Sequence, residues 1–205
     1  MVQTPPKPIV VPTLALNLPP ALRLIVTPEQ FEALAASNRE LRLERTAQGE
    51  LIVNPPTGWQ TGERNSGISG ELYLWWRNAG EPGKVFESST GFKLPNGANR
   101  SPDASWVSQA RWDALTPEQK GTFAEICPDF VVELRSESDT VKGLQAKMAE
   151  YLANGAQLGW LLNPKKRTVE VYRPDKAVEI LENPATVSGE PVLSGFVLDL
   201  KRVWG

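Results

Sequence analysis

A glutamate inside an apolar run constrains this sequence more than any other feature. Residues 130–136 read FVVELRS, and the run begins apolar on both faces, as expected of a central strand in a buried sheet. Glu133 lies within it, and Asp103 stands just before a second apolar run at residues 104–107. A carboxylate in such a place is costly unless it is paired or bound to a cation. We therefore look for function at these two carboxylates.

The composition indicates one soluble domain. The 205 residues, 40% apolar and 22% charged, suffice for a single substantial core. No apolar run approaches the ~20 residues of a membrane span. Residues 1–26 are proline-rich and lack the pattern of a signal peptide, so we expect an extended arm. The single cysteine, Cys127, excludes an internal disulfide, fits a buried apolar site and suits a cytoplasmic protein.

The absence of histidine removes whole classes of chemistry. Ser-His-Asp and Cys-His catalysis, HExxH zinc sites and His-ligated iron are excluded. Proton transfer must use carboxylates, lysine, tyrosine or water activated by a metal. A net charge of −2 argues against tight non-specific binding to nucleic acid, although it leaves room for a local basic surface.

The order of elements predicts an α/β fold. A helix is expected to start at Thr27, with Pro28 at its first position and Gln30 completing a capping box, and to run to about Ser37. A second Thr-Pro-Glu-Gln cap at residues 116–119 predicts a short helical turn. The remaining elements follow from apolar periodicity: a hairpin at 40–45 and 50–53, a helix at 63–78, strands at 84–87, 91–94, 130–136, 158–162, 168–172 and 178–181, and a helix from Asp139 or Thr140 to 154.

The same periodicity brings a lysine toward the carboxylates. On a strand, Glu133 shares its face with Val131 and Arg135. In the helix that follows, Lys147 lies at the edge of the apolar stripe, so its ammonium can reach back to the sheet, whereas Lys142 points to solvent. If Asp103 lies beside Glu133, the carboxylates repel by ~4 kcal/mol at about 4 Å and an effective dielectric near 20. A divalent cation such as Mg²⁺ would remove this conflict.

Several short motifs together resemble the PD-(D/E)XK nuclease superfamily and, more closely, the Uma-two type of bacterial restriction endonucleases. They are Leu43-Glu44 through Leu51, Ser101-Pro102-Asp103, residues 128–136, Lys147 to Tyr151 followed by Gly155, residues 159–164 and residues 192–196. The similarity covers most of the chain beyond residue 27. It implies a restriction-endonuclease-like mixed β-sheet flanked by helices, with an N-terminal arm (1–26) and hairpin, in one domain (27–205).

The resemblance also implies roles for the site residues. Asp103 and Glu133 would hold Mg²⁺ or Mn²⁺, with the backbone carbonyl of Leu134 as a further ligand. Lys147 would stand in for the lysine that the superfamily places two residues after the glutamate. It would orient or help deprotonate the attacking water and stabilise developing charge. Glu44 would be an additional catalytic acid near the metal.

Other positions differ from the family pattern. Arg135 occupies the usual lysine position; arginine stays protonated and cannot act as a base, but it can contact a phosphate. Glu137, Asn163 and Ser194 replace a proline, an aspartate and a proline, and none of these changes removes a proposed ligand.

Each assignment has a simpler alternative. Asp103 can be a strand-start residue, Glu133 can be a buried ion pair with Arg135 or Lys147, and Lys147 can be a surface lysine. Alternation with leucines favours an exposed strand face for Glu44. The tryptophans are more often core residues than base-stacking platforms, and residues 165–167 (Lys-Lys-Arg) are most simply a solvated turn that could touch DNA backbone.

Two functional hypotheses follow from the sequence. The leading one is a Mg²⁺- or Mn²⁺-dependent endonuclease that hydrolyses DNA phosphodiester bonds. The alternative is an inactive nuclease-fold protein that binds nucleic acid or a protein partner, and an unrelated carboxylate metallohydrolase is a third possibility. Cleavage of duplex DNA would favour a homodimer, although no residue in the sequence tests this.

Overall fold

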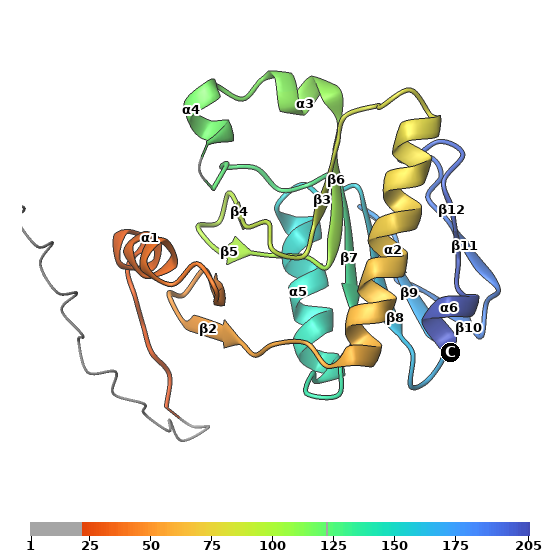
Figure 1. Ribbon diagram of the computed structural model, residues 1–205, viewed down its shortest axis with the longest axis horizontal. Helices are drawn as coiled ribbons and strands as arrows, with labels where there is room; N and C mark the ends of the chain where they lie inside the picture. Colours follow the sequence, from red (N-terminus) through yellow and green to blue (C-terminus); the bar gives the residue numbers. More distant parts are fainter. Residues whose placement is uncertain (1–21, 122) are drawn as a thin grey trace, which may run out of the picture.

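A six-stranded mixed sheet forms the centre of the structure, a computed structural model that describes residues 22–121 and 123–205 (Figure 1). Its strand order is β10-β9-β8-β7-β6-β3, in which only the central β7–β8 pair is parallel. A four-stranded sheet (β2-β1-β5-β4) and the pair β11-β12 complete the fold. The arm expected for residues 1–26 lies mostly outside the described residues.

The bounds of the elements are as follows. The helices are α1 Pro28–Ser37, α2 Trp59–Asn78, α3 Gln109–Asp113, α4 Pro117–Lys120, α5 Val141–Ala153 and α6 Lys201–Trp204. The strands are β1 Arg42–Arg45, β2 Leu51–Asn54, β3 Lys84–Glu87, β4 Phe92–Lys93, β5 Asn99–Arg100, β6 Ala104–Val107, β7 Phe130–Leu134, β8 Leu158–Asn163, β9 Thr168–Tyr172, β10 Glu179–Glu182, β11 Thr186–Ser188 and β12 Val197–Asp199.

Most of the expected elements are present, and the differences occur where local signals are weak. The capping boxes at Thr27 and Thr116 both form. Helix α2 begins at Trp59, four residues before the expected start at 63, because Gly58 occupies the cap without a side-chain hydrogen bond and leaves no cap signal in the sequence. The short elements β5, α3, β11, β12 and α6 were not predicted, since each is too short to show a period.

The central strand β7 faces two different cores. Phe130, Val132 and Leu134 join one core with α2 and the C-terminal segment, while Val131 joins the other with α5. All five residues of β7 are buried, as predicted for a central strand. Strict alternation therefore places the Glu133 side chain on the face that α5 covers.

Helix α5 is held over that face by its cap and by close packing. Thr140, one of the two expected caps, accepts a hydrogen bond from Gly143 N at 3.1 Å. Met148 and Tyr151 are both fully buried against the sheet. A Cβ at Gly159 on β8 would lie 2.3 Å from Met148 Cε, so this glycine allows the helix to approach closely. The position of α5, and with it that of Lys147, is thus fixed by packing.

Truncating Met148 to Ala should destabilise the fold by about 2–5 kcal/mol, because it leaves a cavity between α5 and the sheet. Urea unfolding measures the loss. Leu74→Ala is the matched control, since Leu74 is 55% exposed on α2, and it should change stability by less than about 0.5 kcal/mol. Equal losses in the two variants would contradict this account of how α5 is held.

Candidate active site

Asp103 and Glu133 lie at the same end of neighbouring antiparallel strands. β6 pairs with β7 with Ala104 opposite Val132, and the preceding Asp103 N donates to Val132 O at 2.9 Å. The Asp103 carboxylate then accepts from Leu134 N at 2.8 Å. Asp103 and Glu133 are 8% and 4% exposed. The strand register therefore brings the two predicted carboxylates together.

Lys147 bridges two buried carboxylates from different sheets. Its Nζ lies 2.8 Å from Glu133 Oε1 and 2.9 Å from Glu44 Oε1, with a longer contact of 3.4 Å to Ser101 O. The three contacts account for the three protons of the ammonium. Lys147 thus reaches back to the sheet as its helical position suggested, and it ties β7 to β1.

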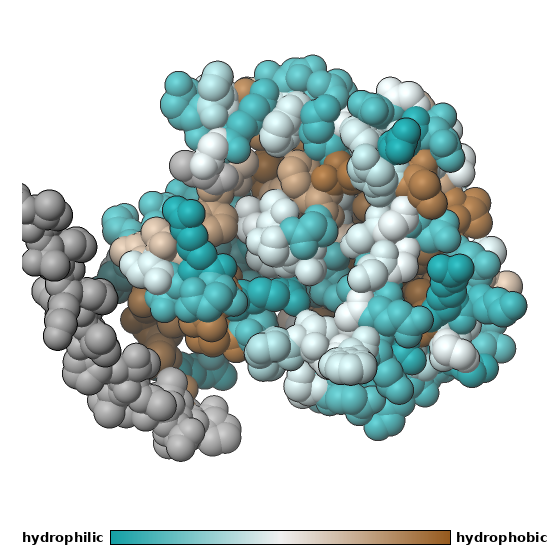
Figure 2. All heavy atoms as spheres, viewed as in Figure 1, coloured by the Kyte–Doolittle hydropathy of each residue, from teal (hydrophilic) through white to brown (hydrophobic). Residues whose placement is uncertain are grey.

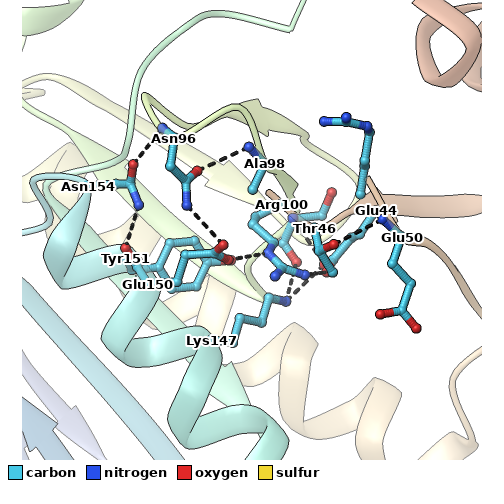
Figure 3. A network of polar contacts seen from close by, with 12 residues as sticks. Glu44, Thr46, Glu50, Asn96, Ala98, Arg100, Lys147, Glu150, Tyr151 and Asn154 are labelled. Carbon is cyan, nitrogen blue, oxygen red and sulfur yellow. Dashed lines mark hydrogen bonds and ion pairs between the residues drawn. The ribbon is translucent and has the colours of Figure 1, made fainter. Parts of the chain in front are cut away.

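Both carboxylate oxygens of Glu44 accept hydrogen bonds, from two cationic side chains and one backbone N–H group (Figure 3). Its Oε1 accepts from Lys147 and from Ser101 N at 3.1 Å, and its Oε2 accepts from Arg100 at 3.2 Å. Glu44 is only 3% exposed. The expectation that alternation would leave Glu44 on an exposed strand face is therefore wrong, because residues 99–101 and α5 cover that side of β1.

An outer layer of polar contacts supports this arrangement (Figure 3). Arg100 Nε donates to Glu150 Oε2 at 2.5 Å, and Asn96 Nδ2 donates to Glu150 Oε1 at 3.0 Å. On the other side, Tyr151 OH donates to Glu133 Oε1 at 3.0 Å. Carboxylate and cation thus alternate from Glu150 through to Glu133, and each charge faces an opposite one.

The two carboxylates that share Lys147 differ in their ionisation. Burial would raise the pKa of Glu44, but Lys147 and Arg100 outweigh it and hold that pKa below its ordinary value. For Glu133, burial raises the pKa to about 7; Lys147 opposes the rise, and the negative charges of Asp103 and Glu44 add to it. Burial also raises the pKa of Asp103, despite the hydrogen bond from Leu134 N.

Lys147 itself stays charged. Burial alone would lower its pKa, but Glu133 and Glu44 together outweigh burial and raise it above the ordinary value. A protonated lysine donates hydrogen bonds and positive charge, and it cannot accept a proton. Of the two actions implied for Lys147, orienting water fits this geometry and deprotonating it does not.

A cavity of about 720 Å³ opens beside these residues. It lies between the start of α2, the β7–α5 loop and the β1–β2 sheet, and Asp103, Glu133, Leu134, Lys147 and Glu44 all line it. Its size is within the range of small-molecule sites, and a nucleotide phosphate can enter such a space. The carboxylates are therefore buried from bulk solvent and still border a space that can hold a ligand.

The residues present suit a divalent cation. Burial raises the pKa values of Asp103 and Glu133, and a divalent cation beside them would offset this effect by favouring their ionised forms. Asn65 donates to Asp103 at 3.1 Å, while its own Oδ1 is buried without a hydrogen-bond partner. Among the described residues, no group of three or more His, Cys, Asp or Glu is arranged to hold a metal. Two carboxylates plus a carbonyl and a substrate phosphate nevertheless form a common Mg²⁺ site.

Sequence and structural comparisons relate this chain and its fold to known proteins. The model of the Uma2 family, described as "Putative restriction endonuclease", matches residues 28–201. A solved structure, described as a putative nuclease belonging to DUF820 from Anabaena variabilis, aligns with a TM-score of 0.72 at 22% identity, covering 87% of this chain and 97% of that one. No curated protein matches the chain.

The chain belongs to the Uma2 family. Since the match extends from the start of α1 into α6, it includes every residue discussed above as part of the site. The likeness to the Anabaena protein supports the restriction-endonuclease-like fold expected from the motifs. No helix in the described part of this Uma2 chain combines the length and hydropathy that a membrane span needs.

Sequence reasoning missed three polar residues of this Uma2 site and placed one differently. Arg42 and Asn65 contact Asp103, at 3.7 and 3.1 Å, and Arg100 clamps Glu44. Only Arg100 had a signal, as it directly precedes the Ser-Pro-Asp motif. Arg135 hydrogen-bonds Asn163 Oδ1 and Asp139 O, both at 3.4 Å, and does not line the cavity.

Replacing Glu133 with Gln should remove a pH dependence of stability from the metal-free protein. The folded pKa of about 7 lies above the ordinary value of 4.5, so the folded state retains a proton that the unfolded chain releases. This contribution to the unfolding free energy is fully present below about pH 4.5 and is lost as the pH rises toward 7. Relative to Glu133→Gln, the parent should lose a few kcal/mol over this range.

Urea unfolding in EDTA across this pH range measures the difference. Glu182→Gln, a change at an exposed carboxylate on β10, should keep the parent's pH dependence. Parallel stability curves for the parent and Glu133→Gln would show that folding does not raise the pKa of Glu133.

Proposed function

We propose that this Uma2 protein is a metal-dependent endonuclease that hydrolyses phosphodiester bonds of DNA. One observation carries the proposal: Asp103 and Glu133 meet at the edge of a cavity with the Lys147 ammonium 2.8 Å from Glu133. The donors fit Mg²⁺ or Mn²⁺ held by Asp103, Glu133 and the carbonyl of Leu134. Such a metal supplies Lewis-acidic charge beside the scissile phosphate and lowers the pKa of water.

The residues of the chain then have separate tasks. Lys147 remains protonated, and its longest contact, at 3.4 Å to Ser101 O, is the one that a phosphate oxygen or the attacking water can replace most easily. Glu44 keeps Lys147 in place and charged while a ligand enters. Because both Glu44 oxygens already accept hydrogen bonds, we assign it this supporting role and do not make it a ligand. Arg135 hydrogen-bonds Asn163 and does not line the cavity, so we assign it no phosphate contact there.

Metal-supported cleavage of supercoiled plasmid tests the proposal. The parent should nick or linearise plasmid in Mg²⁺ or Mn²⁺ at low salt, and EDTA should abolish the activity. Asp103→Asn and Lys147→Met should each lower the rate by about 100-fold or more, because each removes part of the charge stabilisation at the phosphate. Asp103→Asn should also weaken Mn²⁺ binding in a calorimetric titration.

Lys142→Met is the matched control, since Lys142 lies on the same helix α5 but is exposed. It should cleave at the parent rate, and circular dichroism should show that every variant is folded. Equal cleavage by all proteins would indicate a contaminating nuclease and overturn the site assignment.

The alternative is a nuclease fold that binds nucleic acid or a protein partner without cleavage. It is favoured by the ion pairs that Lys147 makes with Glu44 and Glu133 and by the hydrogen bond from Tyr151 to Glu133, because such contacts can serve the fold alone. The same experiment separates the two functions, because this alternative predicts no cleavage by the parent and no loss of Mn²⁺ affinity in Asp103→Asn.

A further inference from the structure

Cations from three separate segments gather at the end of the molecule that holds the cavity. We call this group the basic end; its members are Arg64, Lys165, Lys166, Arg167, Lys201 and Arg202. All but the partly buried Arg64 are exposed. Figure 1 shows the β8–β9 turn, α6 and the start of α2 toward the same lower end, and in Figure 2 hydrophilic side chains gather over that part of the surface.

Two hydrogen bonds and a helix–helix contact tie these segments into one surface. Asn183 N donates to Arg167 O at 2.7 Å, and Trp204 Nε1 donates to the neighbouring Pro184 O at 2.9 Å, which joins the β8–β9 turn to α6. Helix α6 contacts α2, where a Cβ at Gly205 would lie 3.6 Å from Arg64. The basic end is thus formed by the tertiary structure. It includes cations from α2 and α6 as well as the Lys-Lys-Arg run of the β8–β9 turn.

The basic end adjoins the cavity on two sides. Arg64 directly precedes Asn65, which lines the cavity and hydrogen-bonds Asp103. At the other side, Asn163 at the start of the β8–β9 turn accepts from Arg135, whose next neighbour, Ser136, lines the cavity. A chain of phosphates leaving the cavity would therefore pass onto these cations.

The charge of the basic end is not neutralised within the protein. In residues 22–121 and 123–205, none of its six side-chain cations has a carboxylate oxygen within 4.0 Å, although the Asp199 carboxylate accepts from the backbone N of Lys201. The acids that neighbour these cations along the chain or by strand pairing, Glu63, Glu182 and Asp199, form no ion pair with them. Six cations thus gather at one end of a chain whose net charge is −2. A solvated turn accounts for residues 165–167, but it does not account for the convergence of α2 and α6 on the same end.

We propose that the basic end binds the phosphate backbone of a nucleic acid outside the cavity, so that the substrate is a polynucleotide that extends beyond the site of cleavage. This rests on the proposed function for the identity of the site but makes a separate claim about binding. Unpaired Lys and Arg side chains are the groups that neutralise phosphates and release counterions. Because backbone contacts carry no sequence information, this part of the binding is independent of base sequence.

Salt-dependent binding of a fluorescein-labelled short DNA duplex tests the proposal, with EDTA present so that cleavage cannot interfere. Arg64→Gln/Lys166→Gln is compared with Arg77→Gln/Lys176→Gln. The control pair removes the same charge from the opposite end of α2 and from the turn at the opposite end of β9. Fluorescence anisotropy against salt concentration gives the affinity and the slope of its logarithm.

The basic-end variant should bind several-fold more weakly at low salt, with a salt slope smaller by about 2, on two unrelated duplex sequences alike. The control variant should match the parent in both quantities. Equal behaviour of the two double variants, or no binding by the parent at low salt, would overturn the proposal.

The two claims can fail separately. If the parent cleaves plasmid but the two double variants bind DNA equally well, the proposed endonuclease activity is supported and the proposed binding role of the basic end is rejected. If the basic end binds DNA with the expected salt dependence but the parent shows no metal-dependent cleavage, the binding role is supported and the endonuclease activity is rejected.

Discussion

The contact of Lys147 with two buried carboxylates is the interaction on which this site depends. Its ammonium joins Glu133 on the central sheet to Glu44 on the smaller sheet. These contacts fix the positions of β7, α5 and β1 relative to one another. Removing one partner from such a buried group typically costs about 3–5 kcal/mol, because a charge is left uncompensated. The same pairing keeps Lys147 protonated beside the cavity, so the group that stabilises the site is also the one that can stabilise a phosphate.

The electrostatics divide the carboxylates by task. Arg100 and Lys147 hold the pKa of Glu44 below its ordinary value, whereas burial raises the pKa values of Asp103 and Glu133, and neighbouring carboxylates add to the rise at Glu133. A divalent cation would favour the ionised form of both carboxylates, and their position at the cavity edge fits metal-assisted hydrolysis. The basic end lies beyond this acidic centre, and the two together suit a polyanion that needs a metal only at the bond to be broken.

The sequence predicted the centre of the fold better than its periphery. Asp103, Glu133 and Lys147 could be recognised in the sequence because each interrupts or borders an apolar pattern. Asp103 precedes an apolar strand, Glu133 lies within one, and Lys147 lies beside the apolar stripe of a helix. The resemblance placed Glu44 near the site, but strand alternation alone favoured an exposed face for it, because the element that covers it, residues 99–101, comes from a distant part of the chain. Asn65 and Arg42 have no local signal, since only tertiary packing brings them to Asp103. The assembly of the basic end was hidden for the same reason.

The account is tested most directly by a crystal structure grown with Mn²⁺ and measured at the manganese absorption edge. The account predicts one anomalous peak at the cavity edge, about 2.1 Å from carboxylate oxygens of Asp103 and Glu133, with Lys147 still in contact with Glu44. A well-ordered site without a peak at these carboxylates, with Lys147 still between Glu133 and Glu44, would contradict it and show that the buried charges serve the fold alone.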